Sequence, residues 1–190
     1  MEILDLLCRF SASTAANNLI LLGGVCATVL AIRSAKTATI ATLNQNREST
    51  LATLDHNRTV AKQKETALLM FNSRTDDMLR SGYRTIRQLH TSPNDNIVTY
   101  ATDPEKRNSD DADKIRYVLN HWERTAVCVA HEIYCEEILK NSMYTTVVNV
   151  YEQAEPFIRE IRKVAVAETL YQDFEKMVKR WKAAPIKKQG

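Results

Sequence analysis

The sequence predicts an all-α protein with a membrane-spanning segment near its N-terminus. Three observations predict this. The 190 residues include only four glycines and four prolines, about a third of the usual share. Residues 10–32 carry no charge, and apolar residues later in the chain recur every three or four positions, as on one face of a helix. A β-sandwich or barrel needs a turn roughly every 8–12 residues, which so few turn formers cannot supply.

The composition also argues against several common binding functions. Walker and dinucleotide-binding loops need several glycines within a few residues, and the glycines here are scattered. The net charge of +3 is spread along the chain, which gives no basic patch typical of nucleic-acid binding. We therefore expect no cofactor and no nucleic-acid partner.

The uncharged run Phe10–Ile32 is long enough to cross a bilayer as a helix, since at 1.5 Å per residue it spans roughly 34 Å. Its most apolar part is Leu19–Ile32. A cleaved signal peptide and a buried helix of a soluble core are the alternatives. A signal peptide usually begins with a basic region, whereas this N-terminus carries Glu2 and Asp5. We expect residues 1–33 to form a single-pass membrane anchor.

The charges that flank the anchor predict its orientation. Arg33, Lys36 and Arg47 follow the apolar run, and only Arg9 precedes it. Because cations accumulate on the cytoplasmic side, we expect the inner (plasma) membrane, with the N-terminus outside and the C-terminal domain in the cytoplasm. The four cysteines show no disulfide framework, in keeping with a reducing compartment.

Small residues recur within the anchor. Gly23, Ala27 and Ala31 are spaced by four, which places them on one helix face. Such a face lets a second helix approach closely. It therefore predicts a packing site for another membrane helix, with exposure to the lipid bilayer as the alternative.

A near-repeat follows the anchor. Residues 39–47, TIATLNQNR, align with residues 50–58, TLATLDHNR, at an offset of eleven. The repeated apolar positions are Ile40, Leu43, Leu51 and Leu54. Eleven residues per three turns keep such a stripe on one side of a helix, and no glycine or proline interrupts residues 25–81. We expect a helical stalk over 34–60, and one helix or a gently interrupted pair up to about residue 90. Its stripe pairs with a second copy or lies along a later helix of the same chain.

The rest of the chain predicts a helical domain over 61–182 and a flexible tail over 183–190. Two polar runs, over 91–96 and 102–111, mark the one long break. After it, Ser109 or Asp110 caps a helix with a broad apolar face. This face comprises Ile115, Val118, Leu119, Trp122, Ala126, Val129, Ala130 and Ile133.

Two further helices are expected at the C-terminal end, over 136–154 and 155–181. Pro156 would lie in the first turn of the second, where a proline is tolerated. With residues 60–90, these helices predict an antiparallel bundle of about four helices.

Several stretches of this domain form a recognisable pattern. They are RYVLNHWE at 116–123, AVCVAHEIY at 126–134 and EEIL at 136–139. Further matching positions are Ala52–Asp55, Tyr151, Pro156–Ile158, Arg162, Tyr171, Phe174, Glu175 and Trp181. Together they resemble a bacterial and phage family of small membrane-anchored helical proteins known only as a domain of unknown function. The resemblance implies a membrane location and a helical fold, brings no catalytic residue, and extends to a role in phage exclusion or defence.

One group of thiol and imidazole side chains suggests chemistry. On a continuous helix, Cys128, His131 and Cys135 share a sector with His121 and Arg124. Two neighbours could share a zinc ion, but Cys128 and Cys135 would lie about 10.5 Å apart along the axis, and no second His or Cys pair supplies further ligands. We expect a packing face rather than a metal site, with a metal- or ligand-sensing face around Cys128 and His131 as the alternative.

Asn120 and Glu123, together with Arg159 and Arg162, predict a polar network between two helices. A carboxylate removed from water needs a partner, and arginine supplies a forked one. Exposed charges and a ligand site are the alternatives. No catalytic triad order, paired catalytic carboxylates or nucleophile elbow stands out, so we expect no enzyme.

These observations predict a membrane-anchored protein whose cytoplasmic domain acts as a protein-interaction or regulatory module. Its partner would be another protein or a further copy of the chain. A membrane-tethered ligand or metal sensor is one alternative. A scaffold that self-assembles through the small-residue face and the stalk is another. The sequence leaves open the partner, the signal, the number of chains, the host and the pathway.

Overall fold

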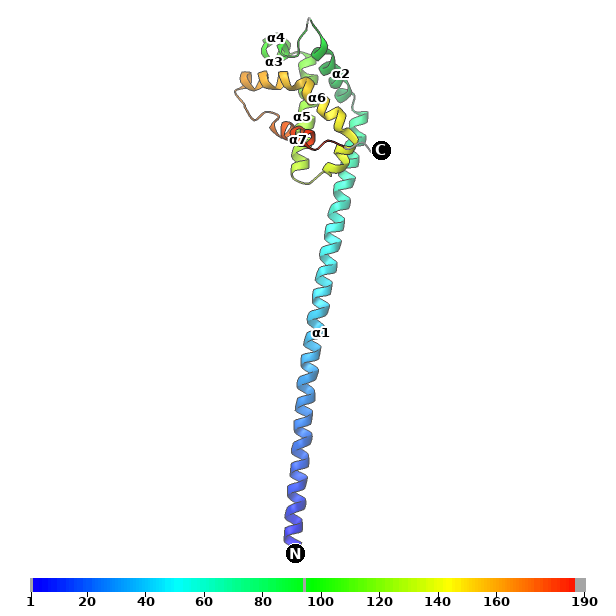
Figure 1. Ribbon diagram of the computed structural model, residues 1–190, viewed down its shortest axis with the longest axis vertical. Helices are drawn as coiled ribbons and strands as arrows, with labels where there is room; N and C mark the ends of the chain where they lie inside the picture. The colour runs from blue at the N-terminus through cyan, green and yellow to red at the C-terminus, as the bar shows by residue number, and fades with distance from the viewer. Residues whose placement is uncertain (1, 94, 187–190) are drawn as a thin grey trace. The chain divides into compact units, whose positions relative to one another are not determined.

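The computed structural model describes residues 2–93 and 95–186. No β-strand occurs in these ranges, which confirms the all-α prediction. The helices are α1 (Glu2–Thr75), α2 (Asp77–Thr91), α3 (Thr99–Thr102), α4 (Pro104–Arg107), α5 (Asp110–Ala130), α6 (Glu136–Ala165) and α7 (Gln172–Ala183) (Figure 1). The chain divides into two compact units, Met1–Asn57 and Arg58–Gly190. Residues 187–190 of the predicted tail lie outside the described ranges.

The described part of the first unit contains only residues of α1, which continues beyond Asn57 into the second unit. From Asn17 to Asn57 every side chain is exposed. The helix includes an 18-residue window of mean hydropathy 1.7, none of it buried. By length and composition, this helix is apolar enough to cross a membrane.

The threonines of this unit bond to the helix's own backbone. The hydroxyls of six of them donate to the carbonyl four residues earlier over 2.8–3.0 Å: Thr28, Thr37, Thr39, Thr42, Thr50 and Thr53. This bond satisfies a hydroxyl that would otherwise need water or a partner. With no glycine or proline between Gly24 and Thr75, α1 runs unbroken to Thr75.

The expected helical run to about residue 90 is interrupted once, at Asp76. This residue is extended and is the N-cap of α2. Its carboxylate accepts from the Leu79 N–H at 2.9 Å and from the Tyr117 hydroxyl at 2.7 Å. Because the cap satisfies a free N–H group of the new helix, the chain ends one helix and begins the next within two residues.

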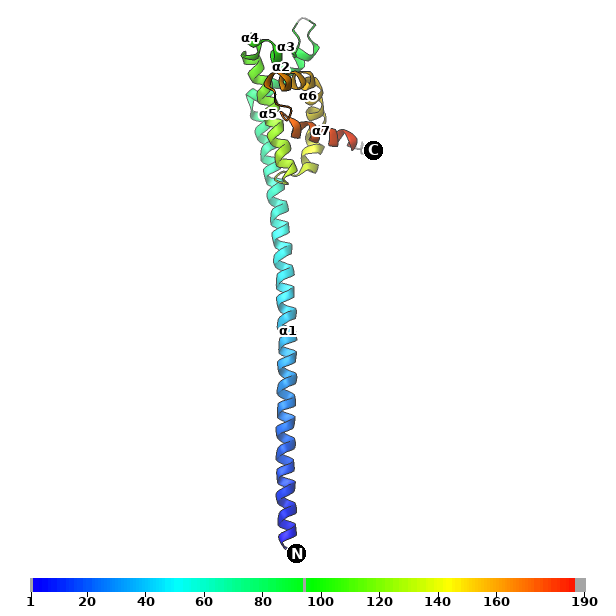
Figure 2. The ribbon, with the colours of Figure 1, turned by 90° about the vertical axis from the view of Figure 1, so that its left-hand side faces the viewer.

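The core of the second unit lies where α2, α5, α6 and α7 pack together (Figure 2). Its largest fully buried side chains include Trp122, Trp181, Phe157, Phe174, Leu79 and Ile86. Large aromatic and branched side chains dominate the free energy gained on burial. Six helices follow α1 within the described ranges, two of them single turns, so the predicted count of about four helices is not confirmed.

Helices α2 and α5 approach closely at Gly82, which is buried. A Cβ atom added there would lie 2.7 Å from the Lys114 carbonyl oxygen and would also meet the Val118 side chain. The two backbones can pack at this distance because residue 82 has no side chain.

The predicted apolar face of α5 is correct from Ile115 to Val129, where each member is buried. Its last two members are wrong: Ala130 is exposed and Ile133 is 49% exposed. The helix ends at Ala130, and Glu132 has a positive φ of 57°. The chain therefore turns before these residues can join the core.

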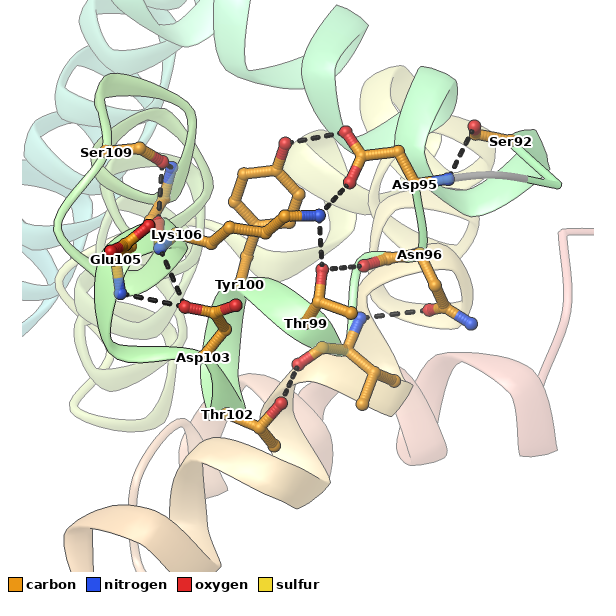
Figure 3. Close-up of polar contacts among 12 residues, drawn as sticks. Ser92, Asp95, Asn96, Thr99, Tyr100, Thr102, Asp103, Glu105, Lys106 and Ser109 are labelled. Carbon is orange, nitrogen blue, oxygen red and sulfur yellow. Dashed lines mark hydrogen bonds and ion pairs between the residues drawn. The ribbon is translucent and has the colours of Figure 1, made fainter.

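The break between α2 and α5 contains two one-turn helices, α3 and α4 (Figure 3). The Asp95 carboxylate accepts from the Lys106 ammonium at 2.6 Å and from the Tyr100 hydroxyl at 2.8 Å. These bonds hold the pKa of Asp95 below its ordinary value. Asp103 caps α4 by accepting from the N–H groups of Glu105 and Lys106. The polar residues that predicted a break thus fold it into an ordered connection.

The predicted boundary between residues 154 and 155 is wrong, because α6 continues through Pro156 to Ala165. A proline removes only one helical hydrogen bond, here the one to the Glu152 carbonyl, and Phe157 and Ile158 are buried directly after it. The chain reverses later. Val166 and Tyr171 both have positive φ values, 50° and 57°, and α7 begins at Gln172.

Candidate functional site

The small-residue face of the first unit is open. Gly23, Ala27 and Ala31 are all exposed, and a Cβ atom added at Gly23 would meet nothing within 4 Å. No residue of this chain described here covers that face, so a second helix has room to approach it.

The stalk stripe is equally uncovered. The exposed fractions of its members are 48% for Ile40, 61% for Leu43, 55% for Leu51 and 59% for Leu54. Ala27 and Leu54 are 27 residues apart, which at about 100° per residue is seven and a half turns. The stripe and the small-residue face therefore point to opposite sides of α1.

The structure disperses the Cys/His group. Cys128 is half-buried near the end of α5, His131 is the exposed C-cap of that helix, and Cys135 is the N-cap of α6. The Cys135 N–H donates to the hydroxyl of the buried Thr66 at 2.7 Å. Because α5 ends at Ala130, the continuous helical sector expected for these residues is wrong. Among the side chains that the structure describes (residues 9, 17–93 and 95–186), no three of His, Cys, Asp or Glu gather closely enough to hold a metal ion.

Glu123 bonds to the start of α7 and not to Arg159 or Arg162, with which the predicted polar network grouped it. Its carboxylate accepts from the backbone N–H groups of Asp173 and Phe174 at 3.3 and 2.8 Å. These groups lie in the first turn of α7, where the positive end of the helix dipole favours a carboxylate. Asn120 is exposed, and its carbonyl accepts from the Arg124 side chain at 3.1 Å.

The two arginines also have other partners. Arg162 donates to the Glu175 carboxylate at 2.8 Å and to the Leu170 carbonyl at 2.8 Å, and it ties α6 to the connection before α7. Arg159 contacts Glu155 and Glu160 on its own helix at 3.5 Å. The four residues of the predicted network thus lie in separate structural contacts.

A polar cavity of about 300 Å³ opens beside the last turns of α1. It is lined by Glu65, Leu68, Leu69, Asn72, Ser73, Asp76, His121 and Tyr134. The His121 Nε2 lies 3.5 Å from the Ser73 Oγ. Burial lowers the pKa of His121, opposed by the charge of Asp76 and aided by that of Arg124. The ring is therefore neutral at neutral pH.

This cavity brings together Ser73, His121 and Asp76, yet their hydrogen bonds are not those of a catalytic triad. The Ser73 hydroxyl donates to the Leu69 carbonyl at 2.7 Å, and the Asp76 carboxylate is bonded to Leu79 and Tyr117. A triad needs the serine proton on the imidazole and the carboxylate behind the ring. The geometry instead suits binding of a polar group.

Ser73 and Asp76 were not predicted as site residues because they lie within a run whose pattern predicts continuous helix. The signal that could have found them is the acidic pair Asp76 and Asp77. Aspartate is among the preferred N-cap residues, and an acid just beyond it favours a helix start.

A family model matches residues 18–181, described as a domain of unknown function (DUF4760). The chain belongs to the DUF4760 family. The matched range of this DUF4760 chain begins in the apolar part of α1 and ends in α7, so it includes the stalk stripe and the cavity at His121. No curated protein and no solved structure matches the sequence.

Proposed function

We propose that this DUF4760 protein is a single-pass membrane-anchored module that assembles with further copies of itself and presents a helical body for protein interaction. The observation that carries the proposal is α1. It holds the apolar stretch and the exposed stripe in one unbroken helix. The family match over 18–181 supports treating these features as parts of one domain.

Orientation follows from charge. The cations Arg33, Lys36 and Arg47 follow the apolar stretch, which favours the cytoplasmic face for the stalk and the body. The anchor would lie in the inner (plasma) membrane with the N-terminus outside.

A second copy is the partner that the stalk favours. A right-handed helical pair needs the same eleven-residue period on both helices, and an identical chain supplies it. Anchoring in one membrane would make the copies parallel and in register.

The body offers a further contact surface for another protein. Leu68 and Phe71, three residues apart on α1, are 44% and 65% exposed. Apolar side chains that share a helix face are typical of helix-mediated recognition. Leu68 also lines the polar cavity at His121, which places apolar and polar recognition elements side by side.

The experiment measures membrane association and then assembly. After alkaline extraction, the full-length protein is expected in the membrane fraction, and the double variant Leu21→Arg and Val25→Arg in the supernatant, since central charges oppose insertion. Wild-type protein in the supernatant would contradict anchoring.

Assembly is measured as native mass in mild detergent. The variant Leu43→Asp with Leu54→Asp is expected to reduce the mass, because it places carboxylates at the pairing stripe. Gln45→Asp is the matched control, as Gln45 lies half a turn from Leu54 around α1. Equal masses for wild type and the stripe variant would rule out pairing through the stalk.

A further inference from the structure

Helices α2 and α6 pack together and border a second pocket of about 220 Å³ at the surface. Six polar side chains line it: Tyr83 and Arg87 from α2, and Thr145, Thr146, Asn149 and Gln153 from α6. On each helix these residues are spaced by about four, so they share one face. The buried Val150 completes the lining.

Arg87 gives this pocket a positive charge. No carboxylate lines the pocket, and no ion pair or hydrogen bond to the Arg87 side chain is found within the described ranges. By contrast, Arg80 on the same helix pairs with Asp77. A guanidinium without a protein partner can take a carboxylate or phosphate in a forked, two-bond geometry.

The neutral polar side chains from α6 in the pocket also make no hydrogen bond to the residues described. The hydroxyls of Thr145 and Thr146 lack the bond to the preceding turn that the threonines of the first unit make. Nor do the amides of Asn149 and Gln153 have a partner among the residues described. Hydroxyl and amide groups both donate and accept hydrogen bonds, which suits a ligand that carries hydroxyl groups.

Tyr83 adds a fixed donor. Its hydroxyl oxygen accepts from the Trp122 indole N–H at 3.0 Å, which orients the phenol. Burial raises the pKa of Tyr83, so the hydroxyl keeps its hydrogen. That hydrogen has no acceptor within the described ranges.

We propose that this pocket binds a small organic anion with a phosphate or carboxylate at one end and hydroxyl groups along its body. Arg87 holds the anionic end, and the threonines, amides and Tyr83 bind the hydroxyl groups. The volume lies below the range of about 300–1,000 Å³ typical of drug-sized ligands, which selects a compact molecule.

The test is isothermal titration of the full-length protein in detergent micelles. Glycerol 3-phosphate probes the phosphate class, malate the carboxylate class, and inorganic phosphate an anion without a hydroxylated body. One of the first two is expected to bind more tightly than inorganic phosphate. Arg87→Gln is expected to weaken that binding on the order of tenfold or more, since a bond to a charged group is lost, and Thr146→Val to weaken it less.

Arg84→Gln is the matched control. Arg84 is an exposed cation of the same helix that does not line the pocket, so its loss is expected to leave affinity unchanged. Arg87 and Thr146 are exposed, and thermal melting without a probe checks that their variants fold. No binding of either organic anion at millimolar concentration overturns the proposal, as does equal weakening by Arg84→Gln and Arg87→Gln.

Discussion

Glu123 determines where α7 begins, although it lies about fifty residues earlier in the sequence. Its carboxylate bonds to two backbone N–H groups of α7. Nothing in the local sequence of α7 shows this cap, since Tyr171 at the N-cap makes no side-chain bond to the helix. A tertiary contact replaces the usual serine or aspartate.

Glu123→Gln is expected to lower the free energy of unfolding by about 1–2 kcal/mol, because a charged acceptor at a helix start is replaced by a neutral one. Urea unfolding followed by circular dichroism measures the difference. Glu168→Gln is the control, as Glu168 is exposed in the connection before α7. An equal effect of both changes would argue against a capping role for Glu123.

His121 makes stability depend on pH. Its pKa in the folded chain lies below 6.5, chiefly through burial, so the unfolded chain binds a proton at a higher pH than the folded chain does. Stability is therefore expected to fall as the pH drops below about 6.5. His121→Gln should flatten this part of the profile.

The Asp76 carboxylate beside His121 does not produce the same signal. Burial raises the pKa of Asp76, but its bonds from Leu79, Tyr117 and Met78 outweigh this, and the net value lies below 3.8. Its contribution is therefore lost only in strong acid. Urea unfolding at a series of pH values separates the pH range of His121 from that of Asp76. An unchanged dependence of stability on pH in His121→Gln would contradict the role given to His121.

At the scale of elements, the contact of α2 with α5 depends on Gly82. Alanine favours a helix over glycine by about 1 kcal/mol, so Gly82→Ala would stabilise an isolated α2. Here the added Cβ meets the Lys114 carbonyl and Val118. Overpacking of this kind destabilises by about 1–3 kcal/mol, and we expect a lower melting temperature.

Gly24→Ala supplies the control, since a Cβ atom there meets nothing within 4 Å. Its melting temperature in detergent is expected to stay the same or rise. A Gly82→Ala variant that melts above wild type would show that the helices separate easily to admit the methyl group.

The periodicity of apolar residues predicted the helix features that neighbouring residues determine. The buried face of α5 from Ile115 to Val129 and the cap at Ser109 both follow from neighbouring residues. The end of α5 does not, because Ala130 and Ile133 continue its apolar spacing, while the turn is held by the bond from Cys135 to Thr66 on α1. The predicted polar network differs for the same reason: Glu123 and Arg162 have partners that only the fold brings near.

At the scale of the molecule, the two units differ in that only the second has an apolar core. Every residue of the apolar core lies between Leu79 and Trp181, and the first unit has no buried side chain from Asn17 onward. A fragment of residues 58–190 is therefore expected to unfold cooperatively and to remain in solution without detergent. A broad, non-cooperative transition in urea would show that the body needs α1 before residue 58.

The threonine bonds of α1 bear on what it takes to remove the stalk from water. Thr39 and Thr50 flank the apolar stripe, and each hydroxyl already donates to a carbonyl of its own helix. A polar group that enters an apolar contact with its hydrogen bond intact loses little on desolvation, whereas a bare hydroxyl loses much more. The stalk can therefore pass from a hydrated, unpaired form to a paired form that excludes water while few hydrogen bonds change. The two forms would differ mainly in hydration.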